Sequence, residues 1–149
     1  MANESIDFIA MEAAHKIIAM PAEDIIGMEK PSVNPIPSTK HWFEGVSLYG
    51  EEILPVINLS KLVSSEIKSG RIEYVVIGRA NKPKAYLAVN RIIRRDSIKD
   101  DQLYPCQRNI GFIEKFIVGT AKKQGAEWSI LDINKLLSSE IIKGIDIND

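Results

Sequence analysis

The sequence predicts an all-β fold with a few short helices, arranged as an antiparallel barrel or sandwich. About nine or ten short segments are rich in valine, isoleucine and other strand-forming residues, and they follow one another as hairpins instead of alternating with helices. A break near residues 62–71 separates these segments into two groups. Two small barrels that share one core would fit this pattern.

Length and composition limit the classes of protein to which the chain can belong. It has 149 residues, 45% of them apolar, which suits one domain or two small subdomains around a real core. The formal net charge of -1 argues against a nucleic-acid binder, which usually carries a basic excess. No apolar run approaches the roughly 18 residues of a membrane helix, and no secretory signal is present, so we expect a soluble, cytoplasmic protein.

The first group of strands opens with a hairpin. Residues 6–14 partly alternate between apolar and polar, and residues 15–21 return after a tight reversal. Pro21 and the acidic residues that follow it are typical of a helix start, but residues 25–30 would equally fit a third strand. Three prolines make residues 31–41 an extended connector.

Two further strands, residues 45–50 and 51–59, complete the first group. A glycine permits a bend at each end of the earlier strand. Pro55 in the later strand is acceptable at a sheet edge or bulge, where no backbone donor is needed. A short helix over residues 60–67, capped by Ser60, follows.

The second group begins with another hairpin, whose strands are residues 72–78 and 84–93. The polar residues 94–105 are expected to form a loop with a short strand or turn. Two more strands, residues 112–123 and 126–133, are joined by a turn at a glycine.

An amphipathic helix over residues 134–143 is expected to close the chain, because its leucines and isoleucines recur at helical spacing. Asp132 is interpreted as the cap of this helix. Residues 53–63 and 128–137 both run from an apolar strand into a short helix containing Lys-Leu, which indicates a weak internal repeat.

No sequence motif for catalysis, cofactor binding or metal binding is present. The serines and glycines form no nucleophile elbow, dinucleotide fingerprint or phosphate loop. His15 and His41 are far apart and belong to no metal-ligand pattern. Cys106 is the single cysteine and has no histidine beside it, so we expect an unreactive thiol. The chain is interpreted as a binding module and not as an enzyme.

The stretch "GVSLYGEEILPVINLSKLV" resembles the signature of the CheW-like domain family. The matching positions are Gly45, Val46, Leu48, Gly50, Ile53, Leu54, Pro55, Val56, Ile57 and Leu59. The hairpin at the start, the proline-bearing segment, the second hairpin and the closing hairpin with its helix also resemble the family and follow in the same order. The resemblance covers nearly residues 6–143.

This resemblance implies a single domain over residues 1–149, built from two SH3-like five-stranded β-barrel subdomains around a shared core. The first barrel is expected over about 6–68, the second over 69–133, and the closing helix over 134–143. The resemblance also implies an adaptor without enzymatic activity or cofactor. Such an adaptor couples methyl-accepting chemoreceptors to the regulatory domain of a CheA-type histidine kinase in bacterial chemosensory arrays.

The chain departs from the family pattern mainly where that pattern is charged. Tyr49 stands where the family has arginine, and Gly27 where it has glutamate. Asn58 and Asn90 replace aspartates, and Ser47 replaces asparagine. Tyrosine offers neither a cation nor a bidentate donor. These departures indicate a divergent member, and one candidate is an accessory adaptor of a pilus-type system that steers twitching motility.

Motif matching assigns partner contacts to residues in both expected subdomains, and the aliphatic ones among them would fit a core position equally well. These residues are Ile25, Met28, Tyr49, Glu51, Val89 and Ile93. Trp42 and Phe43 are favoured as core residues over partner contacts. Tyr49 is the most discriminating position, since an exposed tyrosine would be a typical binding hot spot and a buried one would serve packing.

A small barrel that binds single-stranded nucleic acid is the alternative function. Arg91, Arg94 and Arg95 form the one dense basic stretch, and with the tyrosines they could make a stacking and phosphate-binding face. The balanced charge argues against this function. Binding that weakens steeply with salt would distinguish it from an adaptor.

Overall fold

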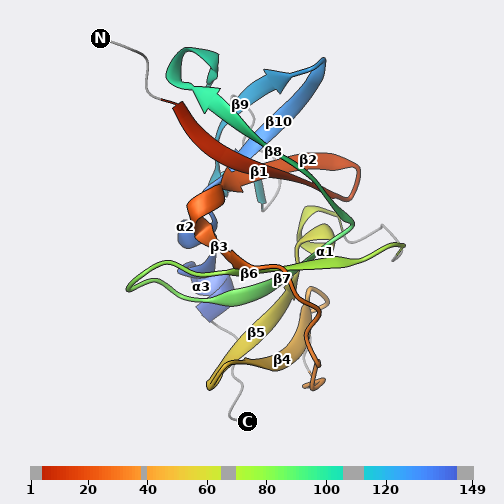
Figure 1. Ribbon diagram of the computed structural model, residues 1–149. Coiled ribbons are helices and arrows are strands. Elements are labelled where there is room, and N and C mark those ends of the chain that lie inside the picture. The colour runs from red at the N-terminus through yellow and green to blue at the C-terminus, as the bar shows by residue number, and fades with distance from the viewer. Residues whose placement is uncertain (1–4, 38–39, 65–69, 106–112, 144–149) are drawn as a thin grey trace.

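Two five-stranded β-sheets make up most of the molecule (Figure 1). This computed structural model describes residues 5–37, 40–64, 70–105 and 113–143, so Cys106 lies outside the described residues. The helices are few and short. The predicted fold class, mostly β with short helices, is therefore confirmed.

Sheet A takes strands from both ends of the chain, in the order β8-β1-β2-β10-β9. Its neighbouring strands are antiparallel except for β2 and β10, which run parallel. The strands are β1 (Ser5–Ala13), β2 (Lys16–Pro21), β8 (Arg91–Lys99), β9 (Ile117–Lys123) and β10 (Ala126–Leu131).

Sheet B takes the middle of the chain, in the order β3-β6-β7-β5-β4. It repeats the pattern of sheet A. In both sheets the third and fourth strands of the order run parallel, and in sheet B these are β7 and β5. The strands are β3 (Ile25–Gly27), β4 (Phe43–Tyr49), β5 (Glu52–Asn58), β6 (Glu73–Ile77) and β7 (Ala85–Val89).

The element order reveals two repeats that exchange their first hairpins. Each half of the chain contains a hairpin, a single strand, a second hairpin and a short helix. Hairpin β1–β2 pairs with β8 and β10 of the second half, whereas β6–β7 pairs with β3 and β5 of the first. The predicted ranges 6–68 and 69–133 therefore follow the two repeats, and the prediction that each range forms its own barrel is wrong. Pairing between strands distant in sequence decides the sheets, and local patterns do not report it.

A short backbone bridge joins the two edge strands of each sheet. In sheet B, Asn34 follows β3 and exchanges backbone hydrogen bonds of 2.8 and 3.0 Å with Val46 of β4. In sheet A, Tyr104 follows β8 and bonds Thr120 of β9 in the same way, at 2.8 and 2.7 Å. Gly45, with φ of +139°, is required beside the first bridge, because a Cβ there would overlap the Asn34 carbonyl. Each sheet thus closes on itself as a small barrel does.

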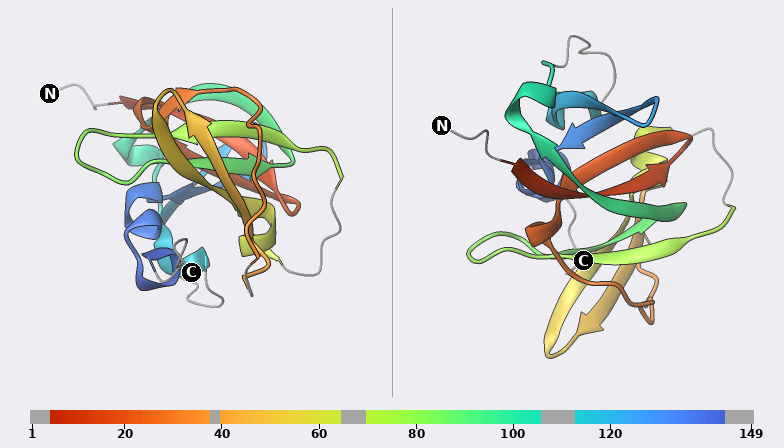
Figure 2. Two further views of the ribbon diagram at one scale, coloured as in Figure 1. Left: turned by 90° about the horizontal axis from the view of Figure 1, so that it is seen from below. Right: turned by 45° about the horizontal axis from the view of Figure 1, so that its top comes forward.

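A shared apolar core joins the two sheets. Met11 and Ile18 of hairpin β1–β2 and Ile57 and Leu87 of sheet B belong to it, and all four are almost fully buried. Figure 2 shows hairpin β1–β2 lying across hairpin β6–β7, and residues of both hairpins belong to this core. Burial of each such side chain contributes about 1.5–3 kcal/mol relative to an exposed position. The interface between the sheets is therefore a main source of stability.

The short helices begin at capping side chains that immediately follow a strand. Helix α1 (Leu59–Val63) is capped by Asn58, whose Oδ1 accepts a hydrogen bond of 3.0 Å from the Lys61 amide, so the predicted Ser60 cap is wrong. Helix α2 (Ile133–Leu137) is capped by Asp132 in the same way, which confirms that prediction. The expected closing helix over 134–143 is divided into α2 and α3 (Glu140–Lys143).

Two segments that the sequence left open or predicted differently are now defined. Residues 21–27 form both candidate structures, a 3₁₀ turn, η1 (Ala22–Asp24), followed by the short strand β3. Of residues 94–105, which were expected to form a loop with a short strand or turn, residues 94–99 belong to the nine-residue strand β8 (Arg91–Lys99). Ion pairs with β1 compensate the charges on β8, since Arg95 bonds Asp7 at 2.7 Å and Arg91 lies 3.7 Å from Glu12.

Two more 3₁₀ turns, η2 (Asp100–Gln102) and η3 (Ile113–Phe116), precede β9.

A buried aspartate fixes the connection between the two sheets. Asp24 lies in η1, between β2 of sheet A and β3 of sheet B, and is 2% exposed. Its carboxylate accepts hydrogen bonds from Arg79 Nε at 2.6 Å and from Asn134 Nδ2 at 3.4 Å. Its carbonyl accepts another from the Gly78 amide at 2.8 Å. The bond to Asp24 also raises the pKa of the Arg79 guanidinium, which keeps Arg79 charged.

Replacing Arg79 with alanine should destabilise the protein, because the substitution leaves the buried Asp24 carboxylate without its cation. Arg79 is partly exposed, so we expect a loss of about 1–3 kcal/mol, below the range for a fully buried pair. The measurement is the free energy of unfolding in urea. Arg71→Ala is the matched control, because its ion pair with Glu73 is exposed and longer, at 3.4 Å. Equal losses in the two variants would contradict the assignment.

Candidate partner-binding surface

Three of the sequence-predicted contact residues point into the protein. Val89 is 1% exposed and lies in the shared core, where a partner at the surface cannot touch it, so this assignment is corrected. Ile25 is half-buried and packs against the same core. Ile93 is half-buried and packs against the interior cluster of sheet A. The predicted set is therefore not one surface.

Two other predicted residues are exposed beside the two edge strands of sheet B, β3 and β4. Met28 follows β3 and is 54% exposed. Glu51 lies in the turn between β4 and β5 and is also exposed. The segment that contains Met28 meets β4 at two points. The Ile26 carbonyl accepts a hydrogen bond from Tyr49, and Asn34 forms the backbone bridge to Val46, so Met28 lies between these two contacts in the sequence.

Tyr49 is half-buried, and its side chain packs within the protein instead of projecting into solvent. Its hydroxyl donates a hydrogen bond of 3.3 Å to the Ile26 carbonyl. Its ring meets the Tyr86 ring edge to face, with centroids 6.1 Å apart and planes at 85°. A direct hot-spot role for this side chain is therefore disfavoured.

The motif match did not indicate the most exposed apolar pair of this region. Leu48 and Ile53 face each other across hairpin β4–β5 and are 61% and 66% exposed. Ile26 on β3 is 42% exposed. Strand alternation could have revealed Leu48, since it lies between the inward-facing Ser47 and Tyr49. We define the β4–β5 tip surface as the set Ile26, Met28, Leu48, Glu51 and Ile53.

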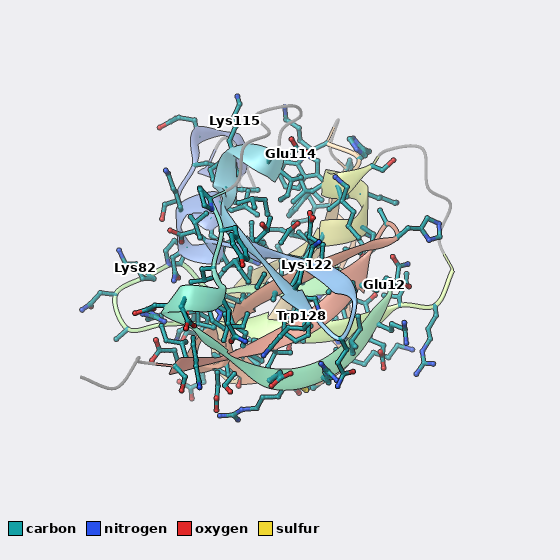
Figure 3. All side chains as sticks on the ribbon, turned by 90° about the horizontal axis from the view of Figure 1, so that it is seen from above. Glu12, Lys82, Glu114, Lys115, Lys122 and Trp128 are labelled. Carbon is teal, nitrogen blue, oxygen red and sulfur yellow. The ribbon has the colours of Figure 1, made fainter. Side chains whose placement is uncertain are left out.

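The second repeat supplies an internal comparison for this pair. Lys122 and Glu127 face each other at the matching place of hairpin β9–β10, and both are exposed. Figure 3 labels Lys122 on this hairpin, close to Trp128 of the neighbouring strand. The fold therefore accepts a charged pair at this position. The aliphatic pair in the first repeat therefore has no counterpart at the matching place of the second repeat.

Trp42 and Phe43 are core residues. They are 5% and 6% exposed and belong to the shared core. The structure thus confirms that they serve packing.

The two asparagines that replace aspartates are explained by their hydrogen bonds. Asn58 donates from Nδ2 to Glu44 Oε1 at 2.9 Å while its Oδ1 caps helix α1. Asn90 accepts hydrogen bonds from the Ala14 amide and the Ser60 hydroxyl, both at 2.9 Å, and donates to the Arg71 carbonyl at 3.3 Å. Each amide supplies a donor that an ionised aspartate lacks.

The arginines of β8 are engaged within the protein. Arg91 and Arg95 pair with carboxylates of β1, as described above. Arg94 bonds Asp96 at 3.1 Å and lies over the Trp128 ring, 5.6 Å from its centroid. Paired arginines attract phosphates weakly, so this arrangement argues against a nucleic-acid-binding face.

A hollow of 620 Å³ lies beside β2 and β10 and is lined in part by Lys16, Glu114 and Glu127. Lys16 is 3.5 Å from Glu114, so one of the two carboxylates is already paired. Within the described ranges, no group of three or more potential metal-binding side chains was found. Likewise, none of the described helices has the length and apolar character to cross a bilayer.

The fold and the surface define an all-β protein with an exposed aliphatic pair on one hairpin. A sequence model described as the CheW-like domain matches residues 7–141. The chain therefore belongs to the CheW-like domain family. Members of this family are non-catalytic scaffold or adaptor proteins, which supports such a role in chemotaxis for this chain.

Two curated relatives and one solved structure are similar to most of the chain. The chemotaxis protein CheW of Thermotoga maritima is 24% identical over 143 residues, 95% of this chain and 94% of that protein. The chemotaxis protein CheW of Treponema pallidum is 31% identical over 128 residues, 78% of this chain and 75% of that protein. The crystal structure of the scaffolding protein TtCheW from Thermoanaerobacter tengcongensis has a TM-score of 0.77 at 21% identity, covering 91% of this chain and 94% of that one, and shares the fold.

Replacing Asn58 with aspartate should destabilise the protein by about 1–2 kcal/mol at neutral pH, because the new carboxylate keeps the helix cap but faces Glu44. The repulsion raises the pKa of the carboxylate pair in the folded state above the unfolded values. The loss is therefore full at neutral pH and shrinks as the pH falls through the carboxylate range. Urea unfolding between pH 7 and pH 4 measures it. Adding Glu44→Gln should restore most of the stability, and an unrescued loss would contradict the explanation.

Stability should fall as the pH rises above about 10, the ordinary pKa of tyrosine. Burial raises the pKa of Tyr86, and the charge of Glu29 raises it further. Burial also raises the pKa of Tyr74, with a contribution from Glu44. The unfolded chain then loses these protons at lower pH than the folded chain, so alkali favours unfolding. Urea unfolding of Tyr86→Phe between pH 8 and pH 11 should show a shallower decline, and an unchanged slope would contradict this cause.

Proposed function

We propose that this protein is a chemotaxis adaptor that couples chemoreceptors to a CheA-type histidine kinase. It binds the regulatory domain of the kinase and the cytoplasmic tip of a methyl-accepting receptor, and it joins membrane receptor arrays from the cytoplasm through these partners. Family membership supports the adaptor role. The names of the two relatives refer to chemotaxis and do not mention pili, so the proposal does not include twitching motility.

The observation that carries the proposal is the difference between the two matching hairpins. The fold places Lys122 and Glu127 at one hairpin and Leu48 and Ile53 at the other, in the same cross-strand register. An aliphatic pair that is more than half exposed is unfavourable in water and contributes less packing than a buried pair. Docking of a partner on the β4–β5 tip surface would remove this pair from water.

The exchange of this pair for its charged counterpart tests the proposal. The double variant Leu48→Lys with Ile53→Glu should fold with nearly unchanged stability, because the other hairpin tolerates the same pair. We expect at least a tenfold loss of affinity for the kinase regulatory domain, since buried apolar contacts at an interface centre are typically worth about 1–3 kcal/mol. Calorimetry or a pull-down with the purified domain of the same genome measures the loss.

The matched control exchanges the charges of the other hairpin. Lys122→Glu with Glu127→Lys keeps the composition of hairpin β9–β10 and leaves the β4–β5 tip surface intact, so kinase binding should persist. Retained affinity in the Leu48 and Ile53 variant would show that this surface is not the docking site. Failure of the unmodified protein to bind either kinase or receptor, under conditions where an established adaptor binds, would overturn the proposed function.

A further inference from the structure

Tyr49 joins the two edge strands of sheet B through its side chain. Strands β3 and β4 lie at opposite ends of the sheet order, and Tyr49 reaches from the end of β4 to the Ile26 carbonyl on β3. Tyr86 supports the same corner from the middle of the sheet, because its hydroxyl donates to the Leu48 carbonyl at 3.1 Å. The tip of hairpin β4–β5 is thus held by two phenols.

Gly27 provides the space that this contact needs. A Cβ at Gly27 would lie 3.2 Å from Tyr49 Oη and 3.5 Å from Tyr49 Cε1. It would also lie 3.5 Å from Val76 Cγ2, which is ordinary contact. The backbone of Gly27 does not have the positive φ that favours glycine, so the reason for glycine here is the closeness of the tyrosine.

The link between Tyr49 and β3 uses no formal charge. Other connections near this corner are ionic, such as Lys84 with Glu52 at 2.7 Å and Arg79 with Glu23 at 2.6 Å. Salt screens exposed ion pairs but has little effect on a hydrogen bond between a phenol and a peptide carbonyl. The closeness of residues 27 and 49 also means that a glutamate and an arginine at these places, as in the family pattern, would be within reach of each other.

We propose that Tyr49 and Gly27 form a matched, uncharged positioning pair that fixes the β4–β5 tip against β3 and keeps Leu48, Glu51 and Ile53 in place for partner docking. The docking step rests on the proposed function, whereas the positioning step does not. Tyr49 acts here through the hairpin that it holds. Replacing either residue alone is expected to loosen the β4–β5 tip, because the space at Gly27 fits the Tyr49 side chain.

Hydrogen–deuterium exchange of the full chain tests the positioning step. Tyr49→Ala should speed exchange of the β4–β5 amides by about tenfold, while amides of β1 and β2 change little. Tyr49→Phe, which keeps the ring and loses the hydrogen bond, should have a smaller effect. Gly27→Ala should loosen the same amides when Tyr49 is present and have no effect in the Tyr49→Ala background.

The charged double variant, Gly27→Glu with Tyr49→Arg, tests the exchange of one pair for another. It should protect the hairpin at low salt and lose more of this protection at high salt than the unmodified protein does. Additive effects of Gly27→Ala and Tyr49→Ala, or unchanged exchange in Tyr49→Ala, would overturn the positioning pair.

Binding of the kinase regulatory domain, measured with the same variants, separates this inference from the proposed function. Weaker binding in proportion to the loosening of the hairpin supports the docking step. Full affinity despite a loosened hairpin overturns the docking step and leaves the adaptor function standing. If the unmodified protein does not bind, the adaptor function fails, and the exchange data still decide the positioning step.

Discussion

The exchange of hairpins between the two repeats is the constraint on which the rest of the structure depends. Because hairpin β1–β2 completes sheet A and hairpin β6–β7 completes sheet B, neither half of the chain can form a full sheet alone. The exchanged hairpins also lie on each other and bury the shared core between them. Sheet pairing and core packing therefore form together, which predicts one cooperative unit and fixes the two hairpins that project from it, β4–β5 and β9–β10.

The two repeats share their helix caps and closing bridges and differ in the exposed side chains of their hairpins. Asn58 and Asp132 occupy the same place after a strand and cap matching helices. The bridges at Asn34 and Tyr104 close matching sheets. The exposed hairpin faces are not preserved, because one carries an aliphatic pair and the other a charged pair. A feature shared by both repeats reflects the fold, and a feature found in one repeat requires an explanation in function.

The sequence predicted the local elements well and the pairing of distant strands poorly. Alternation and turn residues located nearly every hairpin, since these signals lie within a few residues of each other. The membership of the sheets depends on contacts between halves of the chain, which no local pattern carries. The extent of strand β8 was not predicted, because its charged residues are typical of a loop until Asp7 and Glu12 of β1 are placed beside them. Val89 was misassigned because a motif match does not tell which face of a strand is covered.

The loss of charge at several motif positions does not by itself imply a loss of adaptor function. Asn58 and Asn90 satisfy neighbours that aspartates would not, and Tyr49 fills the space that Gly27 leaves. These four departures are thus matched by contacts within the chain, which is the pattern expected when a structural role is kept with different chemistry. Partner recognition then depends on the side chains that these contacts hold in place. Under the proposed function, those are the exposed residues of the β4–β5 tip surface, beside which Tyr49 makes an aromatic contact with Tyr86 and a hydrogen bond to the Ile26 carbonyl.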